Sequence, residues 1–174
     1  RELSGRLDRL QADRARLVAM LQALEAQRRA QPTVRRIAAA RGQLPWPVEG
    51  EVVGFFGVPE GEPPRPARGI RIRPRAAGPV RAVWDGEVVF ADRFEGYGLL
   101  LILDHGSGYY SVYGHAAGLL VGPGDRVRKG QVIAEAAGPD GEPLYFEIRD
   151  GGRPVDPLHW LVGLAATATA ANDD

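Results

Sequence analysis

Cysteine is absent from this chain of 174 residues, and methionine occurs once. The lack of cysteine excludes disulfide bonds, zinc sites built from thiolates and a cysteine nucleophile, but it leaves the cellular compartment open. No apolar run approaches the roughly 20 residues that a transmembrane helix requires, so we expect no direct membrane insertion. The chain opens at Arg1 in a helical pattern without the apolar segment of a signal peptide, and we interpret it as a fragment of a longer protein.

Net charge is absent as well, because 22 lysines and arginines balance 22 aspartates and glutamates. A balanced chain has no overall attraction to nucleic acid or to an anionic membrane, so we expect no nucleic-acid partner and only local electrostatic recognition. The length is sufficient for one folded domain with an appendage, and short of two typical domains.

Leucines recur at alternating steps of three and four residues in the first part of the chain, with Arg14 and Arg28 at two further positions of the same seam. This spacing predicts that residues 1–30 are the end of a coiled coil, a helix that needs a partner. The alternative is an amphipathic helix that lies on its own domain. The leucines of the seam are Leu3, Leu7, Leu10, Leu17, Leu21 and Leu24.

The amino-acid composition and its pattern change after residue 30. Residues 31–43 contain Pro32 and a short helix-forming run, and we interpret them as a linker or a regulatory helical arm. Residues 44–163 alternate short β-branched or aromatic runs with glycine and proline, which predicts an all-β domain. The alanine- and threonine-rich residues 164–174 are predicted to be a flexible tail. The predicted strands are 51–56, 69–73, 80–82, 86–91, 99–104, 109–113, 131–136 and 144–149.

Several segments of the β domain resemble, in order and spacing, the LytM or lysostaphin-like zinc endopeptidase family. They are Leu44–Val48, Pro79–Ala82 with Asp85–Val89, Gly96–Gly98, Asp104–His115, Val121–Ile133, and Phe146–Arg149 followed by Pro154–Pro157 and Trp160–Leu161. The resemblance implies a mostly antiparallel β-sheet domain with a long groove across one sheet.

Active members of that family hold zinc with a His-x-Gly-x-Asp segment and with the second histidine of a His-x-His segment. Here the three ligand positions are occupied by Ala67, Arg71 and Tyr145. Catalysis by zinc requires about three protein ligands and an open position for water. The resemblance therefore implies a degenerate domain with no catalytic residues, no metal site and no cofactor. Only His115 remains of the catalytic set.

The chain contains the residues for two other catalytic arrangements, and neither is well supported. A new metal site could recruit His105, His115, Asp104 or Asp85, but the family has a histidine at the His105 position that is not a zinc ligand. Ser111 has His115 four residues later but no convincing carboxylate to orient it. We therefore predict that the chain is not an enzyme.

Strand alternation gives the expected content of the groove. If Ile70, Ile72, Leu144, Phe146 and Ile148 enter the core, their neighbours Arg71, Tyr145, Glu147 and Arg149 face the groove. Counting back from His115 places Tyr113 on the same face. The resemblance to degenerate relatives adds three positions, so that the predicted partner-binding groove comprises Arg68, Arg71, Tyr97, Leu100, Tyr113, His115, Tyr145, Glu147 and Arg149.

The sequence Leu144–Arg149 resembles the divisome-associated murein hydrolase activators more than any active endopeptidase. The resemblance implies a periplasmic protein at the division site that binds and allosterically activates an N-acetylmuramoyl-L-alanine amidase through the groove during cell separation. In that group the FtsE–FtsX complex binds the coiled coil, most of which would be missing here. A peptidoglycan-binding module and a residual zinc endopeptidase remain the alternatives.

Overall fold

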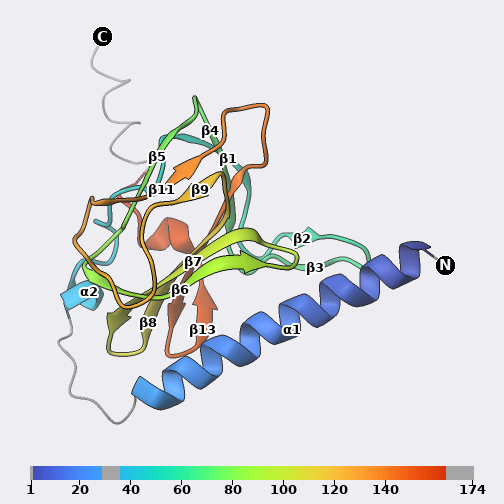
Figure 1. Cartoon of the computed structure of the whole chain (residues 1–174), viewed down its shortest axis with the longest axis horizontal. Helices are drawn as coiled ribbons and strands as arrows, with labels where there is room; N and C mark the ends of the chain where they lie inside the picture. The colour runs from blue at the N-terminus through green and yellow to red at the C-terminus, as the bar shows by residue number, and fades with distance from the viewer. Residues whose placement is uncertain (1, 29–35, 164–174) are drawn as a thin grey trace.

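The computed structural model describes residues 2–28 and 36–163, and it consists of a β domain with one long helix along one side (Figure 1). The helix α1 spans Glu2–Arg28, and a single turn of helix, α2, spans Arg36–Ala39. Within these residues, no helix has the length and apolar character to cross a membrane.

The large sheet has eight strands, and its paired neighbours are all antiparallel. A three-stranded sheet and a two-stranded hairpin complete the domain, and the 3-10 helix η1 (Pro157–His159) follows the last strand. In order, the large sheet contains β1 (Gly50–Gly54), β4 (Ile70–Pro74), β12 (Leu144–Asp150), β8 (Tyr109–Ala116), β7 (Gly98–Gly106), β6 (Gly86–Phe94) and β10 (Arg126–Val127), with β13 (Arg153–Val155) paired to β12. The smaller sheet contains β5 (Gly78–Arg81), β11 (Val132–Ala136) and β9 (Gly118–Leu119), and the hairpin contains β2 (Pro59–Glu60) and β3 (Arg65–Pro66).

This architecture confirms the predicted mostly antiparallel β domain. All eight predicted strands are present, with boundaries that differ by a few residues. The unpredicted strands β2, β3, β9, β10 and β13 are two or three residues long. Such strands are too short to display an alternating pattern, so only their pairing partners define them.

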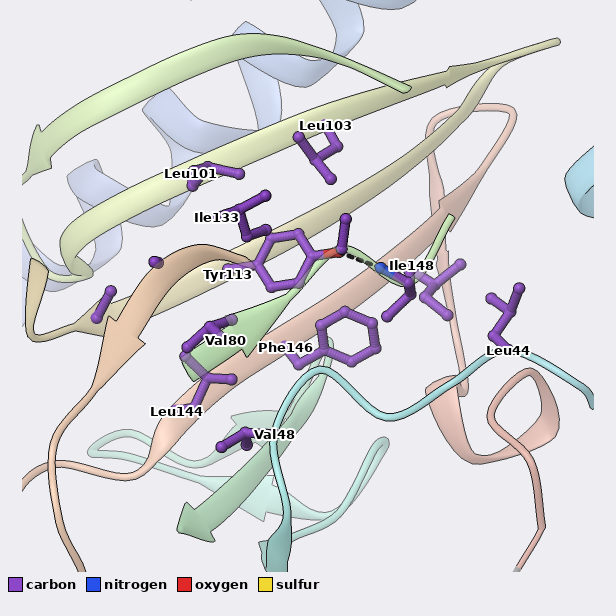
Figure 2. Close-up of a cluster of buried hydrophobic side chains, with 14 of the residues drawn as sticks. Leu44, Val48, Val80, Leu101, Leu103, Tyr113, Ile133, Leu144, Phe146 and Ile148 are labelled. Carbon is purple, nitrogen blue, oxygen red and sulfur yellow. Dashed lines mark hydrogen bonds between the residues drawn. The ribbon is translucent and has the colours of Figure 1, made fainter. Parts of the chain in front are cut away.

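One face of the large sheet packs against the three-stranded sheet and forms the main core. Tyr113 and Phe146 lie side by side there, with ring centroids 5.3 Å apart (Figure 2). Alternate residues of β7 and β12 supply the aliphatic part of this core, as the period of two requires. They include Leu101, Leu103, Leu144 and Ile148, which meet Val80 and Ile133 of the smaller sheet.

The opposite face of the large sheet packs against α1. Leu17 and Leu21 of the helix are 1% and 0% exposed, and they join a second buried cluster that is separate from the main core. The β domain contributes to this cluster Tyr97 of the β6–β7 turn and the strand residues Leu100, Ile102, Tyr110, Val112 and Tyr145. We call the surface formed by these six residues the helix-binding face.

The position of α1 decides between the two sequence interpretations of the leucine seam. Its second half lies on its own domain, as the alternative interpretation proposed, because Leu17 and Leu21 are buried on the helix-binding face. The first half keeps exposed leucines, with Leu3 and Leu10 at 76% and 49% exposure. Residues 29–35 and the predicted flexible tail at 164–174 lie outside the described residues.

The short helix α2 belongs to the main core. Ile37 is 1% exposed and packs among the residues of that core. Further along the chain, Leu44 bridges Leu161 in parallel, which ties the start of the β domain to its end. Within the predicted linker 31–43, the part around Ile37 is therefore anchored to the domain.

Candidate functional site

The three positions that would hold zinc in an active relative lie at the junction of β4 and β12. Tyr145 pairs directly with Arg71 across the two strands, and the Arg71 guanidinium lies over the Tyr145 ring at 5.4 Å. Ala67 precedes β4 and is buried. Gly69 permits this close packing, because a Cβ on it would lie 2.3 Å from the carbonyl oxygen of Phe146. The strands therefore keep the arrangement that the family motif needs, with different side chains.

A carboxylate neutralises the arginine at the lost ligand position. Arg71 donates from Nε and Nη2 to the two carboxylate oxygens of Glu60 in the β2–β3 hairpin, each at 3.2 Å. Arg14 of α1 contacts the same carboxylate at 3.4 Å. Glu60 thus links the former zinc position to the helix that covers the sheet.

The residues at this junction do not fit a metal ion. Within residues 2–28 and 36–163, no three histidine, cysteine, aspartate or glutamate side chains are grouped to hold one. Of the catalytic set expected from the family resemblance only His115 is present, and burial, with the nearby positive charge of Arg71, lowers its pKa. A single neutral imidazole beside a guanidinium supplies one of about three ligands that zinc requires.

The backbone of β8 is irregular at His115, and this changes the predicted position of Tyr113. His115 has a φ of 57°, and the pairing of β7 with β8 shifts register between Leu99↔Ala116 and Leu101↔Tyr113. This irregularity interrupts the alternation on which the count from His115 relied. His115 does line the cavity beside the helix-binding face, but Tyr113 points to the opposite side and lies in the main core. The prediction that Tyr113 faces the groove was wrong.

Tyr113 instead ends a buried hydrogen-bond chain. Its hydroxyl accepts from the backbone N–H of Val83 at 3.1 Å and lies 3.0 Å from Oγ of Ser111. Ser111 Oγ lies 2.6 Å from Nε2 of His105, whose Nδ1 lies 2.8 Å from the Asp85 carbonyl. Burial lowers the pKa of His105 to about 4. The serine partner is thus His105 and not His115, and the enclosed position of the pair leaves no access for a substrate.

Tyr145, Glu147 and Arg149 share one face of β12, as alternation predicted. The Tyr145 hydroxyl donates to Glu147 Oε2 at 2.8 Å, and Arg149 Nε donates to Glu147 Oε1 at 3.1 Å. Arg149 Nη1 also donates to the carbonyl of Gly152 at 3.0 Å. Burial and the neighbouring Glu147 carboxylate raise the pKa of Tyr145 well above its usual value.

This row of three side chains is buried, which corrects the expectation that the row is solvent-accessible. Tyr145, Glu147 and Arg149 are 5%, 0% and 1% exposed. The physical reason is that α1 and the adjacent turns cover this face of the sheet. Glu147 and Arg149 therefore form an internal ion pair that supports Tyr145, and their substitution would affect stability.

The remaining predicted residues surround the cavity or lie under the helix. Leu100 is fully buried against α1, whereas Tyr97 packs on Tyr145 with ring centroids 5.6 Å apart. Burial raises the pKa of Tyr97 to about 12. Arg68 lines the cavity, which measures about 390 Å³ and lies between α1, the β2–β3 hairpin and the sheet. One guanidinium nitrogen of Arg68 is buried without a hydrogen-bond partner among the described residues.

A family model for peptidase family M23 matches residues 65–157, which include the lost ligand positions and the helix-binding face. The chain belongs to peptidase family M23. The M23 domain is similar to the murein hydrolase activator EnvC of Escherichia coli strain K12, with 41% identity over 129 residues, covering 72% of this chain and 30% of EnvC. It is also 39% identical to the murein hydrolase activator NlpD of the same strain over 119 residues, covering 67% and 30% of the two chains.

The fold is shared with a crystal structure of a putative M23 peptidase from Pseudomonas aeruginosa. The TM-score is 0.65 at 24% identity, and the match covers 90% of this chain and 62% of that one. These comparisons confirm the expected M23 fold and the resemblance to the activator group. The M23 domain spans about a third of the length of the two activators.

The sequence interpretation missed the residues through which α1 meets the domain. Glu60 lies in a proline- and glutamate-rich stretch that predicts only a surface loop, and Asp13 lies off the leucine seam. Asp13 is nevertheless 2% exposed. The only sequence signal for the burial of Asp13 is its spacing of four residues from Leu17, which places both on one face of the helix. That signal can be used only when the helix is known to pack on the sheet.

Proposed function

We propose that this M23 domain is a non-catalytic activator that binds an N-acetylmuramoyl-L-alanine amidase. The observation that carries the proposal is the replacement of all three zinc ligands by Ala67, Arg71 and Tyr145 in a domain that keeps the M23 fold. A domain that retains its fold and loses its metal is suited to binding. Its similarity to EnvC and NlpD, both named as murein hydrolase activators, supports a murein hydrolase as the partner.

The helix-binding face is the proposed amidase site. It combines tyrosines and aliphatic side chains with arginines at its edge, which are the residue types that contribute most to binding energy at interfaces. It already binds a helix, α1, through Leu17 and Leu21. A helix from the amidase would fit the same surface and would shift the amidase toward its active conformation by binding that conformation better.

The amidase helix and α1 compete for one surface, so α1 restrains activation in this proposal. Burying two leucine side chains stabilises the docked helix by about 3–6 kcal/mol relative to exposure. The sequence predicted a regulatory arm at residues 31–43, but Ile37 of that segment packs in the main core. We therefore propose α1 as the restraining element, whose release exposes the face.

The similarity to the two activators supports a setting in the cell envelope. Within it, we propose that the chain acts in the periplasm at the division site and that FtsE–FtsX binds its coiled coil. The exposed Leu3 and Leu10 are suited to continuing such a coiled coil toward its partner.

Dye release from labelled sacculi tests the proposal. The purified chain alone should release no dye, and it should accelerate release by an amidase encoded in the same genome. A chain with Leu17→Ala and Leu21→Ala should activate more strongly, because its α1 is less firmly docked. The matched control, Leu3→Ala with Leu10→Ala, should behave as the unmodified chain does.

Two results would contradict the proposal. Dye release by the chain without amidase would show a residual endopeptidase. The second result has two parts: neither the unmodified chain nor the Leu17→Ala, Leu21→Ala variant stimulates the amidase, and the chain binds isolated muropeptides. This result would identify a peptidoglycan-binding module.

A further inference from the structure

Four side chains of α1 form a single stripe toward the sheet, at intervals of four residues. They are Asp13, Leu17, Leu21 and Glu25. Leu17 and Leu21 fill the helix-binding face, and the two carboxylates lie beyond it at either end. The stripe covers 12 residue steps, about 18 Å along the helix at 1.5 Å per residue.

Each carboxylate meets a glycine in a β-turn. At one end, a Cβ on Gly96, between β6 and β7, would lie 3.1 Å from Asp13 Oδ2. At the other end, a Cβ on Gly152, between β12 and β13, would lie 2.0 Å from Glu25 Oε2. Both glycines have positive φ values, 87° and 81°. A side chain at Gly152 would occupy the volume of the Glu25 carboxylate, so the turn fits a helix that carries an acid at this position.

The charge of Asp13 is balanced locally. Arg16, one turn further along α1, forms an ion pair with Asp13 and also contacts Glu95 of the β6–β7 turn at 3.3 Å. Asp13 is 2% exposed although it lies at the end of the stripe. The cation that pairs with Asp13 moves with the helix, so the position of α1 along the sheet depends on contacts with the β domain. Asp13 lies against Gly96 and Arg16 contacts Glu95, and a shift by one turn would lose both contacts.

The stripe distinguishes the face from a general apolar groove. A surface that bound any amphipathic helix would need only the two leucines. Here the contacts at Gly96 and Gly152 set a fixed length, and the exposed Leu3 lies outside the contact. The bound helix is therefore defined by both its composition and its register.

Resting on the proposed function, we infer that the face selects a partner helix with this same stripe: acidic, leucine, leucine and acidic residues at positions i, i+4, i+8 and i+12. The amidase helix that displaces α1 carries these four residues, and α1 is its intramolecular copy. A helix with neutral ends or with different spacing between the leucines binds more weakly.

A labelled synthetic peptide of residues 9–28 tests the inference by fluorescence anisotropy. The receptor is the full chain with Leu17→Ala and Leu21→Ala, or with Leu17→Ala alone if the double variant does not fold. The peptide should bind this receptor saturably. It should bind the unmodified chain at least tenfold more weakly, because the tethered α1 is present at a high effective concentration.

Peptide variants separate the two parts of the stripe. Leu17→Asp in the peptide should abolish binding, and Asp13→Asn with Glu25→Gln should weaken it about tenfold. The control peptide with Leu10→Ala should bind like the original. Equal binding by the peptide with neutral ends would overturn the inference, as would saturable binding of the Leu17→Asp peptide.

Adding the amidase separates this inference from the proposed function. Displacement of the peptide by an amidase that contains a helix with the stripe supports both. An amidase that displaces the peptide but has no such helix overturns the inference and leaves the proposed function intact. If the peptide variants behave as expected and no amidase displaces the peptide, the preference of the face stands and the proposed function fails.

Discussion

The two faces of strand β12 carry alternate residues of one short sequence, yet they have different chemistry. Leu144, Phe146 and Ile148 enter a core closed by a second sheet. On the other side, Tyr145 lies under α1 beside an internal ion pair of Glu147 and Arg149. On β12, the face closed by the second sheet is therefore apolar, whereas the face closed by α1 carries polar groups that pair with one another.

The largest expected effect tests the sheet-covered face. Phe146→Ala should lower the free energy of unfolding by about 3–5 kcal/mol, because it leaves a cavity in a closely packed core. Urea denaturation measures this loss. The control Phe55→Ala removes a ring that is 48% exposed and should cost far less. Similar losses for both variants would mean that the core is not packed as described.

The ion pair on the helix-covered face gives the next largest effect. Arg149→Met should cost about 3 kcal/mol or more, because it leaves the Glu147 carboxylate buried without its cation. The double variant Glu147→Gln, Arg149→Met should recover much of that loss, since no uncompensated charge remains. Chemical denaturation of the three proteins provides the comparison. A cost below about 0.5 kcal/mol for Arg149→Met would place its side chain on an accessible surface.

A pH dependence belongs to the sheet-covered face through His105. Burial lowers its pKa to about 4, so the unfolded chain, with a pKa near 6.5, takes up the proton first. The free energy of unfolding should therefore fall as the pH falls from 6.5 to 4, by at most about 1.4 kcal/mol per pH unit. Unfolding measured across this range, with His105→Gln as reference, isolates the contribution. Parallel curves for the two proteins would argue against a buried neutral His105.

The smallest effect is at the edge of the helix-covered face. Arg14→Ala removes a partly buried ion pair with Glu60 and should lower the protection of α1 amides from hydrogen exchange by less than about 1 kcal/mol. Added salt should weaken the contact in the unmodified chain and have little effect in the variant. A loss as large as that of Leu17→Ala would mean that the ion pair, rather than the leucines, holds the helix.

The fold could be predicted well because its signals are local and repeated. Alternation in the strand 144–149 gave the correct faces for Phe146 and Tyr145. The same rule failed at Tyr113, because His115 in the left-handed region interrupts the strand. A single positive φ at a non-glycine residue leaves no trace in an alternating pattern, so the error was not detectable from sequence.

The site was predicted in part. The loss of the zinc ligands at Ala67, Arg71 and Tyr145 is a statement about residue identity, and the pairing of Arg71 with Tyr145 brings two of these positions together. The exposure of the site was not predictable. The leucine seam was consistent with a coiled-coil partner or with the chain's own sheet, and the spacing of leucines is equal in both cases.

By itself, the sequence determined the β domain, its M23 membership and the identities of the residues at the lost zinc positions, since periodicity and motif spacing are properties of the chain alone. Only the tertiary structure decided that α1 covers one face of the large sheet. The burial of Glu147 and Arg149, the role of Glu60 and the contact of Asp13 and Glu25 with the turns at Gly96 and Gly152 all depend on where α1 rests. That position results from contacts between residues far apart in the chain, such as Arg14 with Glu60 and Arg16 with Glu95, which are 46 and 79 positions apart, and no local pattern exists for such contacts.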